Sequence, residues 1–384
     1  MNTFRLPTTI CFGNDALDKL KEYKNQRIVI FTDHFMFNSG VAQRIADRID
    51  ESSKVSIFGE VLPDPPIELI VKGLEFLLKE NANVVIALGG GSSIDAAKAV
   101  ILMAKRSSQK QDIQLVAIPT TSGTGSEVTQ FSVITDEQSG VKFPLVHEDL
   151  LPDVAILSPE LVATAPPFIT ADTGFDVITH ALEAYISTES NDFSDALAEK
   201  SLELAFEYLP IAYKDGTNLV ARDKMHNASC LAGMAFNIAG LGVNHGIAHS
   251  FSARFHIPHG RANAMLLPHV MHYNAQLPDS FTADEYEFST AAKKLALVAS
   301  CIGIKAPNIK YAVNALCDYI TDLKRTCGIP ETLEAAKVTR NDYMKNKKSI
   351  IESALNDACT ATNPRYMTPE GIEEILSNIA IFNN

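Results

Sequence analysis

Hydrophobic positions follow two different spacings between the amino terminus and about residue 165. Short runs of apolar and β-branched residues alternate there with stretches whose apolar residues recur every three or four positions, the spacings of strands and helices. One helical stretch, Ile67–Glu80, is entered behind two prolines and carries an apolar stripe of Leu69, Val71, Leu74, Leu77 and Leu78. The predicted strands are Arg27–Thr32, Val55–Val61, Val84–Leu88, Leu115–Ile118, Phe131–Ile134 and Val154–Leu157. Alternating strands and helices predict an α/β domain with a mostly parallel sheet covered on both faces.

The pattern becomes helical after the sequence Ala165-Pro166-Pro167 and stays so almost to the end. Near the carboxyl end, Thr368-Pro369 predicts a helix start, because a capping hydroxyl precedes a proline at the first helical position. A chain of 384 residues also exceeds the size at which single cores stop growing, about 250–300 residues. We therefore predict an α/β domain over residues 1–168 and an all-helical domain over residues 169–384. We expect the ligand in a cleft between them, beyond the carboxyl ends of the strands.

Charge and composition exclude several classes of protein. The chain has 33 Lys and Arg against 46 Asp and Glu, a net charge of −13. Nucleic-acid binding and docking on an anionic membrane both need basic surfaces, so neither partner is expected. We expect no export signal and no membrane-spanning helix, since the first residues lack an apolar segment and no apolar run reaches about 18 residues. Six scattered cysteines without a C-x-x-C pair predict buried thiols in a cytoplasmic protein, not disulfides.

Three glycines follow the predicted strand Val84–Leu88. Gly89, Gly90 and Gly91 lead through Ser92 into a helical stretch. Such a turn presents backbone N–H groups to a phosphate, and Ser92 could cap the helix or donate to that phosphate. The alternative is a tight strand-to-helix turn without a ligand.

Other strand ends carry polar residues that suit a dinucleotide. The segment from Pro119 to Glu127 alternates hydroxyl residues with glycine, which suits a loop beside a sugar or nicotinamide ring. An ordinary solvated loop would have the same composition. Asp33 ends the first predicted strand, where a carboxylate can accept the hydroxyls of an adenosine ribose and repel a 2′-phosphate. Its alternative role is a helix cap. Lys142 could reach a diphosphate or ribose, or simply be solvated.

Histidines gather in the helical half. Six of the ten lie between residues 245 and 272. Asp176 and His180 have an i, i+4 spacing, as have His245 and His249, and His259 follows in a turn. One carboxylate and three imidazoles form a plausible catalytic site for Fe²⁺ or Zn²⁺. For Asp176 and His180 alone, a capped helix with a core histidine would be the ordinary interpretation. His249 could be a further ligand or a proton relay, and we favour the relay.

These residues fall into motifs that resemble the iron-containing (group III) alcohol dehydrogenase family over essentially the whole chain. Two segments resemble its cofactor loops: Gly89-Gly90-Gly91-Ser92-x-x-Asp95 and Pro119-Thr120-Thr121-x-Gly123-Thr124-x-Ser126-Glu127. Three resemble its metal signatures: Gly174-x-Asp176-x-x-Thr179-His180-Ala181-x-Glu183-Ala184, His245-Gly246-x-x-His249 and His259-Gly260-x-x-Asn263-Ala264. Thr362-Asn363-Pro364-Arg365 resembles its carboxyl-terminal motif.

The resemblance implies a set of roles and a fold like that of dehydroquinate synthase. It implies that the metal, Fe²⁺ or alternatively Zn²⁺, is held by Asp176, His180, His245 and His259. It implies that NAD(H) is bound by Asp33, Gly89, Gly90, Gly91, Ser92, Asp95, Thr120, Thr121 and Lys142. Within the family, the chain resembles the propanol dehydrogenases of propanediol utilisation. We therefore expect a short-chain primary alcohol and its aldehyde, such as 1-propanol and propionaldehyde, as substrates.

The same resemblance leads us to expect association with a bacterial microcompartment, and base rates of symmetric assembly lead us to expect a homodimer. The chain departs from the family pattern at the substrate pocket, because Phe251 and Arg254 stand where relatives carry a small, glycine-containing stretch.

Three alternative functions remain open. A polyol dehydrogenase on the same scaffold is the nearest one. A dehydroquinate-synthase-like lyase is a remote one, since residues 170–280 supply few basic side chains for a phosphorylated acidic substrate. A non-enzymatic metal and nucleotide sensor is the third.

Overall fold

The computed structural model describes residues 4–107, 112–136, 141–278 and 287–382, with the side chains of 141 and 142 outside this description. The chain forms two compact units, Met1–Ala165 and Pro166–Asn384. The division falls at the proline pair where the sequence pattern changes.

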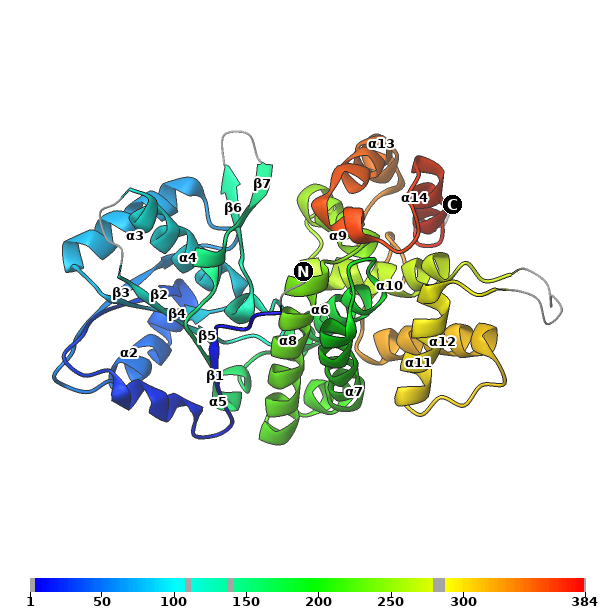
Figure 1. Cartoon of the computed structure of the whole chain (residues 1–384). Helices are drawn as coiled ribbons and strands as arrows, with labels where there is room; N and C mark the ends of the chain where they lie inside the picture. The colour runs from blue at the N-terminus through cyan, green and yellow to red at the C-terminus, as the bar shows by residue number, and fades with distance from the viewer. Residues whose placement is uncertain (1–3, 108–111, 137–140, 279–286, 383–384) are drawn as a thin grey trace. The chain divides into compact units, whose positions relative to one another are not determined.

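Unit 1 is built on a six-stranded sheet in which all neighbouring strands run parallel, in the order β1-β8-β5-β4-β2-β3 (Figure 1). The prediction of a parallel α/β sheet is confirmed. The strands are β1 (Thr9–Phe12), β2 (Arg27–Asp33), β3 (Lys54–Val61), β4 (Val84–Gly89), β5 (Gln114–Pro119) and β8 (Val154–Leu157). The predicted strand Phe131–Ile134 exists as β6 (Phe131–Asp136) but lies outside this sheet. It pairs antiparallel with β7 (Val141–Val146), a strand absent from our prediction, in a separate ribbon.

Alternate residues of the central strands pack into two cores, one on each face of the sheet. On one face, Val85 and Ala87 pack with residues of α3 (Ile67–Glu80) and α4 (Gly91–Arg106). On the other, Ile86 and Leu88 pack with residues of η1 (Ala16–Glu22), α2 (Val41–Ala46) and α5 (Pro159–Val162). This period of two is what a sheet covered on both faces requires. The remaining short helices are α1 (His34–Asn38), η2 (Ser126–Val128) and η3 (Glu148–Leu150).

Helix α3 has the predicted bounds, but its buried face is rotated from the predicted stripe. Val71 is 41% exposed, whereas Ile70 and Gly73 are buried beside Leu69 and Leu77. Gly73 explains the shift, because a Cβ there would lie 2.9 Å from ring and methyl carbons of Phe31 and Val100. A glycine contributes no hydrophobic signal to the sequence, yet it marks the closest approach of the helix to the sheet.

Unit 2 is helical throughout its described residues, as predicted (Figure 1). Its central helix α6 (Pro167–Ile186) begins at the second proline of the pair and is buried on nearly every side from Thr170 onward. Thr368 caps α14 by accepting from the N–H of Gly371 at 3.1 Å, which confirms that predicted start. The other helices are α7 (Asp192–Lys214), α8 (Leu219–Ala239), α9 (Val243–Phe255), α10 (His259–Ala275), α11 (Thr290–Cys301), α12 (Ile309–Thr326), α13 (Arg340–Asn356), η4 (Ala358–Thr362) and α14 (Pro369–Ser377).

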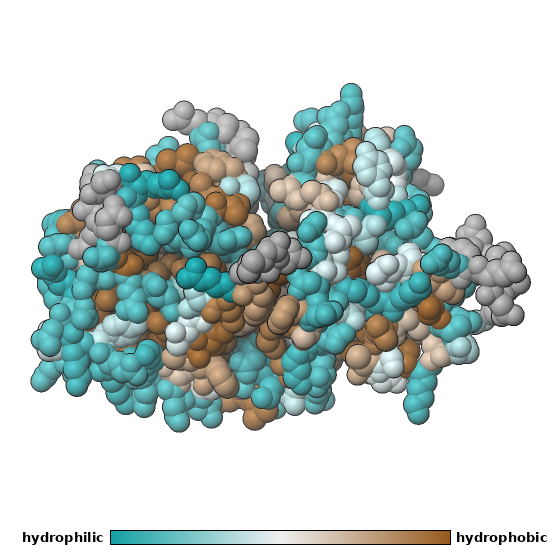
Figure 2. All heavy atoms as spheres, viewed as in Figure 1, coloured by the Kyte–Doolittle hydropathy of each residue, from teal (hydrophilic) through white to brown (hydrophobic). Residues whose placement is uncertain are grey.

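All six cysteines are free, in agreement with the absence of a disulfide framework. The prediction that they are all buried is wrong: Cys301 is exposed, and Cys11 and Cys359 are half-buried. Within the described parts of the chain, no single helix has the length and apolarity of a membrane span, although α8 and α9, bent by 109°, pass that test as a pair. Hydrophilic residues cover most of the face seen in Figure 2, with hydrophobic residues between them.

Candidate metal centre and cofactor loops

Three helices of unit 2 bring the predicted metal ligands together. Asp176 and His180 lie one turn apart on α6, His245 lies in the first turn of α9, and His259 is the first residue of α10. Asp176, His180 and His245 are each at most 5% exposed, whereas the side chain of His259 is 35% exposed. Charged groups are rarely buried this deeply unless they bind a partner or a metal.

The ligand atoms converge on one small volume. One donor atom each from Asp176, His180 and His245 lies within 4.8 Å of the other two. His259 is not in this compact group, but its Nε2 lies 3.5 Å from Asp176 Oδ1. The rings of His180 and His245 stack with their centroids 4.6 Å apart. A carboxylate and imidazoles at this spacing fit a divalent cation such as Fe²⁺ or Zn²⁺.

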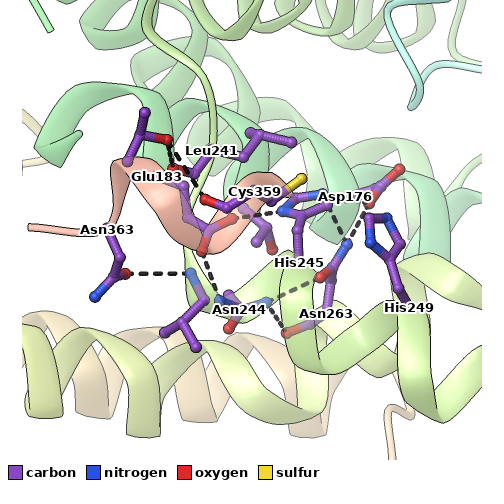
Figure 3. Close-up of polar contacts among 12 residues, drawn as sticks. Asp176, Glu183, Leu241, Asn244, His245, His249, Asn263, Cys359 and Asn363 are labelled. Carbon is purple, nitrogen blue, oxygen red and sulfur yellow. Dashed lines mark hydrogen bonds and ion pairs between the residues drawn. The ribbon is translucent and has the colours of Figure 1, made fainter. Parts of the chain in front are cut away.

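The side-chain amide of Asn263 shows where these atoms point (Figure 3). Its Nδ2 lies 2.7 Å from Asp176 Oδ1 and 3.1 Å from the Nε2 atoms of His245 and His259. Three acceptor atoms on three helices thus surround a single donor, and a bound cation would take the place of that donor. The sequence analysis gave Asn263 no role, although it lies one helical turn after His259.

Glu183 contacts the ring of His245 on the side away from the proposed metal (Figure 3). Its Oε2 lies 2.5 Å from His245 Nδ1, and its Oε1 accepts the backbone N–H of Asn244 at 2.7 Å. A proton held on Nδ1 leaves the Nε2 lone pair free for a metal. Burial, followed by the neighbouring histidines, lowers the pKa of His245 well below 6.5, which keeps the ring neutral. Burial raises the pKa of Glu183, and hydrogen bonds from backbone N–H groups at the start of α9 oppose this by stabilising the carboxylate.

Glu183 could have been recognised from its spacing. It follows His180 by three residues and Asp176 by seven, so all three share one face of α6. The sequence analysis recorded it in a motif but assigned it no role.

Gly260 allows α10 to approach α6 closely enough for His259 to reach the centre. A Cβ at Gly260 would lie 2.0 Å from the backbone oxygen of Asp172, an atom that cannot move aside as a flexible side chain can. Arg261 holds the same junction through two hydrogen bonds to the carboxylate of Asp172, at 3.1 and 3.0 Å.

We predict that Gly260→Ala displaces His259 and weakens metal binding by at least about tenfold. Removing a residue that only hydrogen-bonds to a metal ligand already lowers metal affinity by about 10–100-fold, and displacing the ligand itself should lower it at least as much. Overpacking should also lower the free energy of unfolding by about 1–3 kcal/mol. Chelator competition and thermal denaturation measure the two effects. The control is Gly303→Ala, where an added Cβ meets nothing within 4 Å but strains a positive φ of 88°. Gly303→Ala should therefore lower stability alone, and normal metal affinity in Gly260→Ala would contradict the assignment.

His249 lies at the exposed side of the centre. Its side chain is 46% exposed, and its ring stacks on that of His259 with centroids 5.2 Å apart. Its Nδ1 is 2.8 Å from Asp357 Oδ2. Burial alone would raise the pKa of Asp357. The hydrogen bond to His249 opposes burial, and the pKa of Asp357 lies below its usual value. Asp357 was not predicted, because it lies 108 positions from His249 along the chain and no spacing links the two.

In unit 1, the glycine turn joins β4 to the amino terminus of α4. Gly89 has a φ of 147°, and a Cβ there would lie 2.4 Å from Ser93 Oγ, so both conformation and space demand glycine. The N-cap residue is Gly90, and no side chain caps the helix. Of the two roles considered for Ser92, helix capping is therefore excluded, and its Oγ accepts the N–H of Asp64 at 3.3 Å. An uncapped helix amino terminus suits an anionic diphosphate.

The hydroxyl-rich loop lies directly against this turn. The N–H of Thr120 donates to the carbonyl of Gly89 at 3.0 Å, and Thr121 Oγ1 lies 3.5 Å from the Cβ position of Gly90. Asp33, at the end of the adjacent strand β2, caps α1 through Oδ1, which accepts the N–H of Met36 at 2.9 Å. Its Oδ2 lies 3.3 Å from the Cβ position of Gly89. Asp33 thus has the alternative capping role and also faces the glycine turn.

Asp95 and Lys98 of α4 form hydrogen bonds with residues at the end of this hydroxyl-rich loop and just after it. Asp95 accepts from Ser126 Oγ at 2.7 Å and from the N–H of Val133 at 3.0 Å, so both carboxylate oxygens are bonded within the protein. Lys98 is fully buried and donates to the carbonyls of Thr129 and Phe131 at 2.7 and 2.8 Å. Burial lowers the pKa of Lys98 to about 8. These contacts make Asp95 a support of the cofactor loop.

Lys142 and Phe251 were predicted to lie near the cofactor and the substrate pocket, respectively. The side chain of Lys142 lies outside the described residues, although its backbone pairs with Thr135 in the β6–β7 ribbon. Phe251 is completely buried and packs against Phe255, so it belongs to the core of unit 2, contrary to the expected bulk on the pocket wall.

Known families match both units. Residues 7–159 match the family model "Iron-containing alcohol dehydrogenase", and residues 170–380 match "Fe-containing alcohol dehydrogenase family, C-terminal". The chain belongs to the iron-containing alcohol dehydrogenase family. This membership confirms the resemblance seen in the sequence and explains the α/β and helical halves.

Individual members of the family match over nearly their whole length. The chain is 43% identical to the 1-propanol dehydrogenase PduQ of Citrobacter freundii over 381 residues, covering 99% of this chain and 100% of that protein. A solved 1,3-propanediol oxidoreductase is 32% identical with a TM-score of 0.87, covering 98% and 99% of the two chains. The sulfoacetaldehyde reductase of Bifidobacterium kashiwanohense, solved in complex with NAD⁺, is 28% identical with a TM-score of 0.86 and full coverage of both chains.

Proposed function

We propose that this iron-type dehydrogenase interconverts a short-chain primary alcohol and its aldehyde with NAD(H) as the redox partner. The convergence of Asp176, His180 and His245, with His259 beside Asp176, carries the proposal. When bound there, a divalent metal polarises the substrate oxygen as a Lewis acid. The similarity to the 1-propanol dehydrogenase of Citrobacter freundii supports 1-propanol and propionaldehyde as the substrate pair.

The protein's own residues supply orientation and proton handling. Glu183 fixes the Nε2 lone pair of His245 toward the centre, and the glycine turn offers uncapped N–H groups to the dinucleotide. With NAD⁺ bound in unit 1, oxidation of the alcohol would transfer a hydride from the carbinol carbon to the cofactor and would release one proton. The exposure of His249 and its hydrogen bond to Asp357 support a role in carrying that proton to solvent.

Anaerobic purification with iron, followed by a chain-length series of alcohols and aldehydes, tests this function through the absorbance of NADH. We expect the highest kcat/KM for 1-propanol or propionaldehyde. Higher values for glycerol or propanediols would favour the polyol alternative, to which the similarity to a 1,3-propanediol oxidoreductase gives limited support. No NADH signal with any alcohol, in protein shown to contain iron, would favour a sensor or a lyase.

Asp33 is proposed to select NAD(H) by repelling a 2′-phosphate. Two like charges about 4 Å apart cost about 1–4 kcal/mol near a protein surface. Asp33→Asn keeps an oxygen to cap α1 and removes the charge, so relative kcat/KM for NADP(H) should rise about tenfold. Asp47→Asn, an exposed carboxylate of the same unit, is the control. Equal use of both cofactors by the parent enzyme would contradict this role.

We further propose that the enzyme is a cytoplasmic homodimer that associates with a bacterial microcompartment. Free cysteines and the need for NAD(H) are consistent with a reducing, cofactor-rich compartment. Light scattering tests the dimer, and co-sedimentation with isolated microcompartments tests the association.

A further inference from the structure

A second group of metal-binding side chains lies beside the proposed catalytic centre. His249 Nδ1, Asp357 Oδ2 and Cys359 Sγ offer one ligand atom each, and ligand atoms of the three residues lie within 4.8 Å of one another. The same spacing describes Asp176, His180 and His245. His249 lies on α9, whereas Asp357 and Cys359 lie at the start of η4, which packs against α9.

The second group is already held in a fixed geometry by hydrogen bonds. Asp357 Oδ1 accepts the backbone N–H of Cys359 at 2.9 Å, and Oδ2 lies 2.8 Å from His249 Nδ1. Two elements far apart in the sequence therefore present an imidazole, a carboxylate and a thiol to one another. This set contains a soft sulfur ligand, in contrast to the all-nitrogen and oxygen set of the catalytic centre.

We propose that His249, Asp357 and Cys359 form a second cation site, suited to Zn²⁺ and other borderline-soft divalent ions, whose occupation inhibits the enzyme. Cys, His and Asp are the ligands that Zn²⁺ takes in proteins, and three of them leave the fourth tetrahedral position for water. The site is reachable, because the side chains of His249 and Asp357 are 46% and 20% exposed.

Binding releases one proton. The thiol of Cys359 gives up its proton to solvent as the metal–sulfur bond forms, since a coordinating thiol is deprotonated. Nδ1 of His249 must be unprotonated to bind the ion, so a ring proton held there in the hydrogen bond to Asp357 moves to Nε2.

Inhibition follows from the position of His249, and this part of the inference depends on the proposed function. The ring of His249 stacks on His259 at the mouth of the catalytic centre, inclined by 15°. An ion on Nδ1 would fix this ring and replace its hydrogen bond to Asp357. His249 could then no longer carry the proton released by alcohol oxidation.

Cobalt substitution tests the site without any turnover. The protein is first given one equivalent of Fe²⁺ per chain, which the catalytic nitrogen and oxygen ligands favour, and is then titrated with Co²⁺ under anaerobic conditions. We expect a thiolate-to-cobalt charge-transfer band that saturates at one equivalent, because the proposed catalytic ligands include no sulfur. The band should vanish in Cys359→Ser and remain in Cys301→Ser, which removes an exposed cysteine of α11. No band in the parent, or an unchanged band in Cys359→Ser, would overturn the proposal.

Zinc titration of the iron-loaded enzyme tests inhibition separately. We expect the Zn²⁺ concentration for half inhibition to rise at least about tenfold in Cys359→Ser, since losing a ligand should cost no less than losing an outer partner. Equal inhibition of parent and Cys359→Ser would refute the inhibitory role. Asp357→Asn, which keeps an oxygen to cap η4, provides a second variant if Cys359→Ser fails to fold. A cobalt band in a protein without alcohol dehydrogenase activity would keep the site and reject the proposed function.

Discussion

His259→Ala should abolish alcohol oxidation while leaving NAD(H) binding intact. The predicted metal centre lies entirely in unit 2, whereas the glycine turn and Asp33 lie in unit 1, so the loss of an imidazole should not reach the cofactor loops. Lewis-acid stabilisation supplies several kcal/mol, and each 1.36 kcal/mol is a factor of ten in rate. Turnover should therefore fall by at least about a thousandfold.

Turnover and NADH binding of His259→Ala are measured separately. NADH absorbance follows turnover, and the fluorescence of NADH itself reports binding, because the chain contains no tryptophan to complicate the signal. His272→Ala, an exposed histidine on the same helix, is the matched control and should behave like the parent. Retained turnover in His259→Ala would exclude His259 from the centre. Loss of NADH binding would show instead that the substitution disturbs the fold.

Glu183→Gln should weaken metal binding by about 10–100-fold, the range known for outer partners of metal ligands. Glutamine has the size of glutamate, but it can present an NH₂ group to His245 Nδ1. The proton of His245 would then move to Nε2 and remove the lone pair that faces the centre. Chelator competition measures metal affinity directly, and saturating iron should restore part of the activity.

Glu199→Gln controls for the loss of a carboxylate. Glu199 lies on α7 and accepts the hydroxyl of Tyr185, a residue of α6, at 2.5 Å. It has no contact with the proposed ligands, so Glu199→Gln should leave metal affinity unchanged. Equal metal affinity of Glu183→Gln and the parent would show that Glu183 supports only the backbone of α9.

The sequence predicted those parts of the molecule that depend on local periodicity. All strands of the sheet except β1, the bounds of α3 and the capped start of α14 follow from side-chain spacing and capping within a few residues. The rotated face of α3 and the separate β6–β7 ribbon did not follow. Both depend on contacts with distant residues, such as the approach of Phe31 and Val100 to Gly73.

In the candidate site, too, local spacing revealed some residues, whereas contacts between distant parts of the chain did not show in the sequence. Asp176 with His180, and His245 with His249, show their shared faces through an i, i+4 spacing. Asn263 and Glu183 lie at helical spacing from proposed ligands and could have been found by the same argument. Asp357 could not, because only the packing of η4 against α9 brings it to His249.

Metal removal and reconstitution test whether alcohol oxidation requires one bound ion. We predict that the metal-free protein, given Fe²⁺ without oxygen, regains 1-propanol oxidation in proportion to the iron bound and reaches its maximum at one ion per chain. Full activity in protein stripped of metal would contradict it.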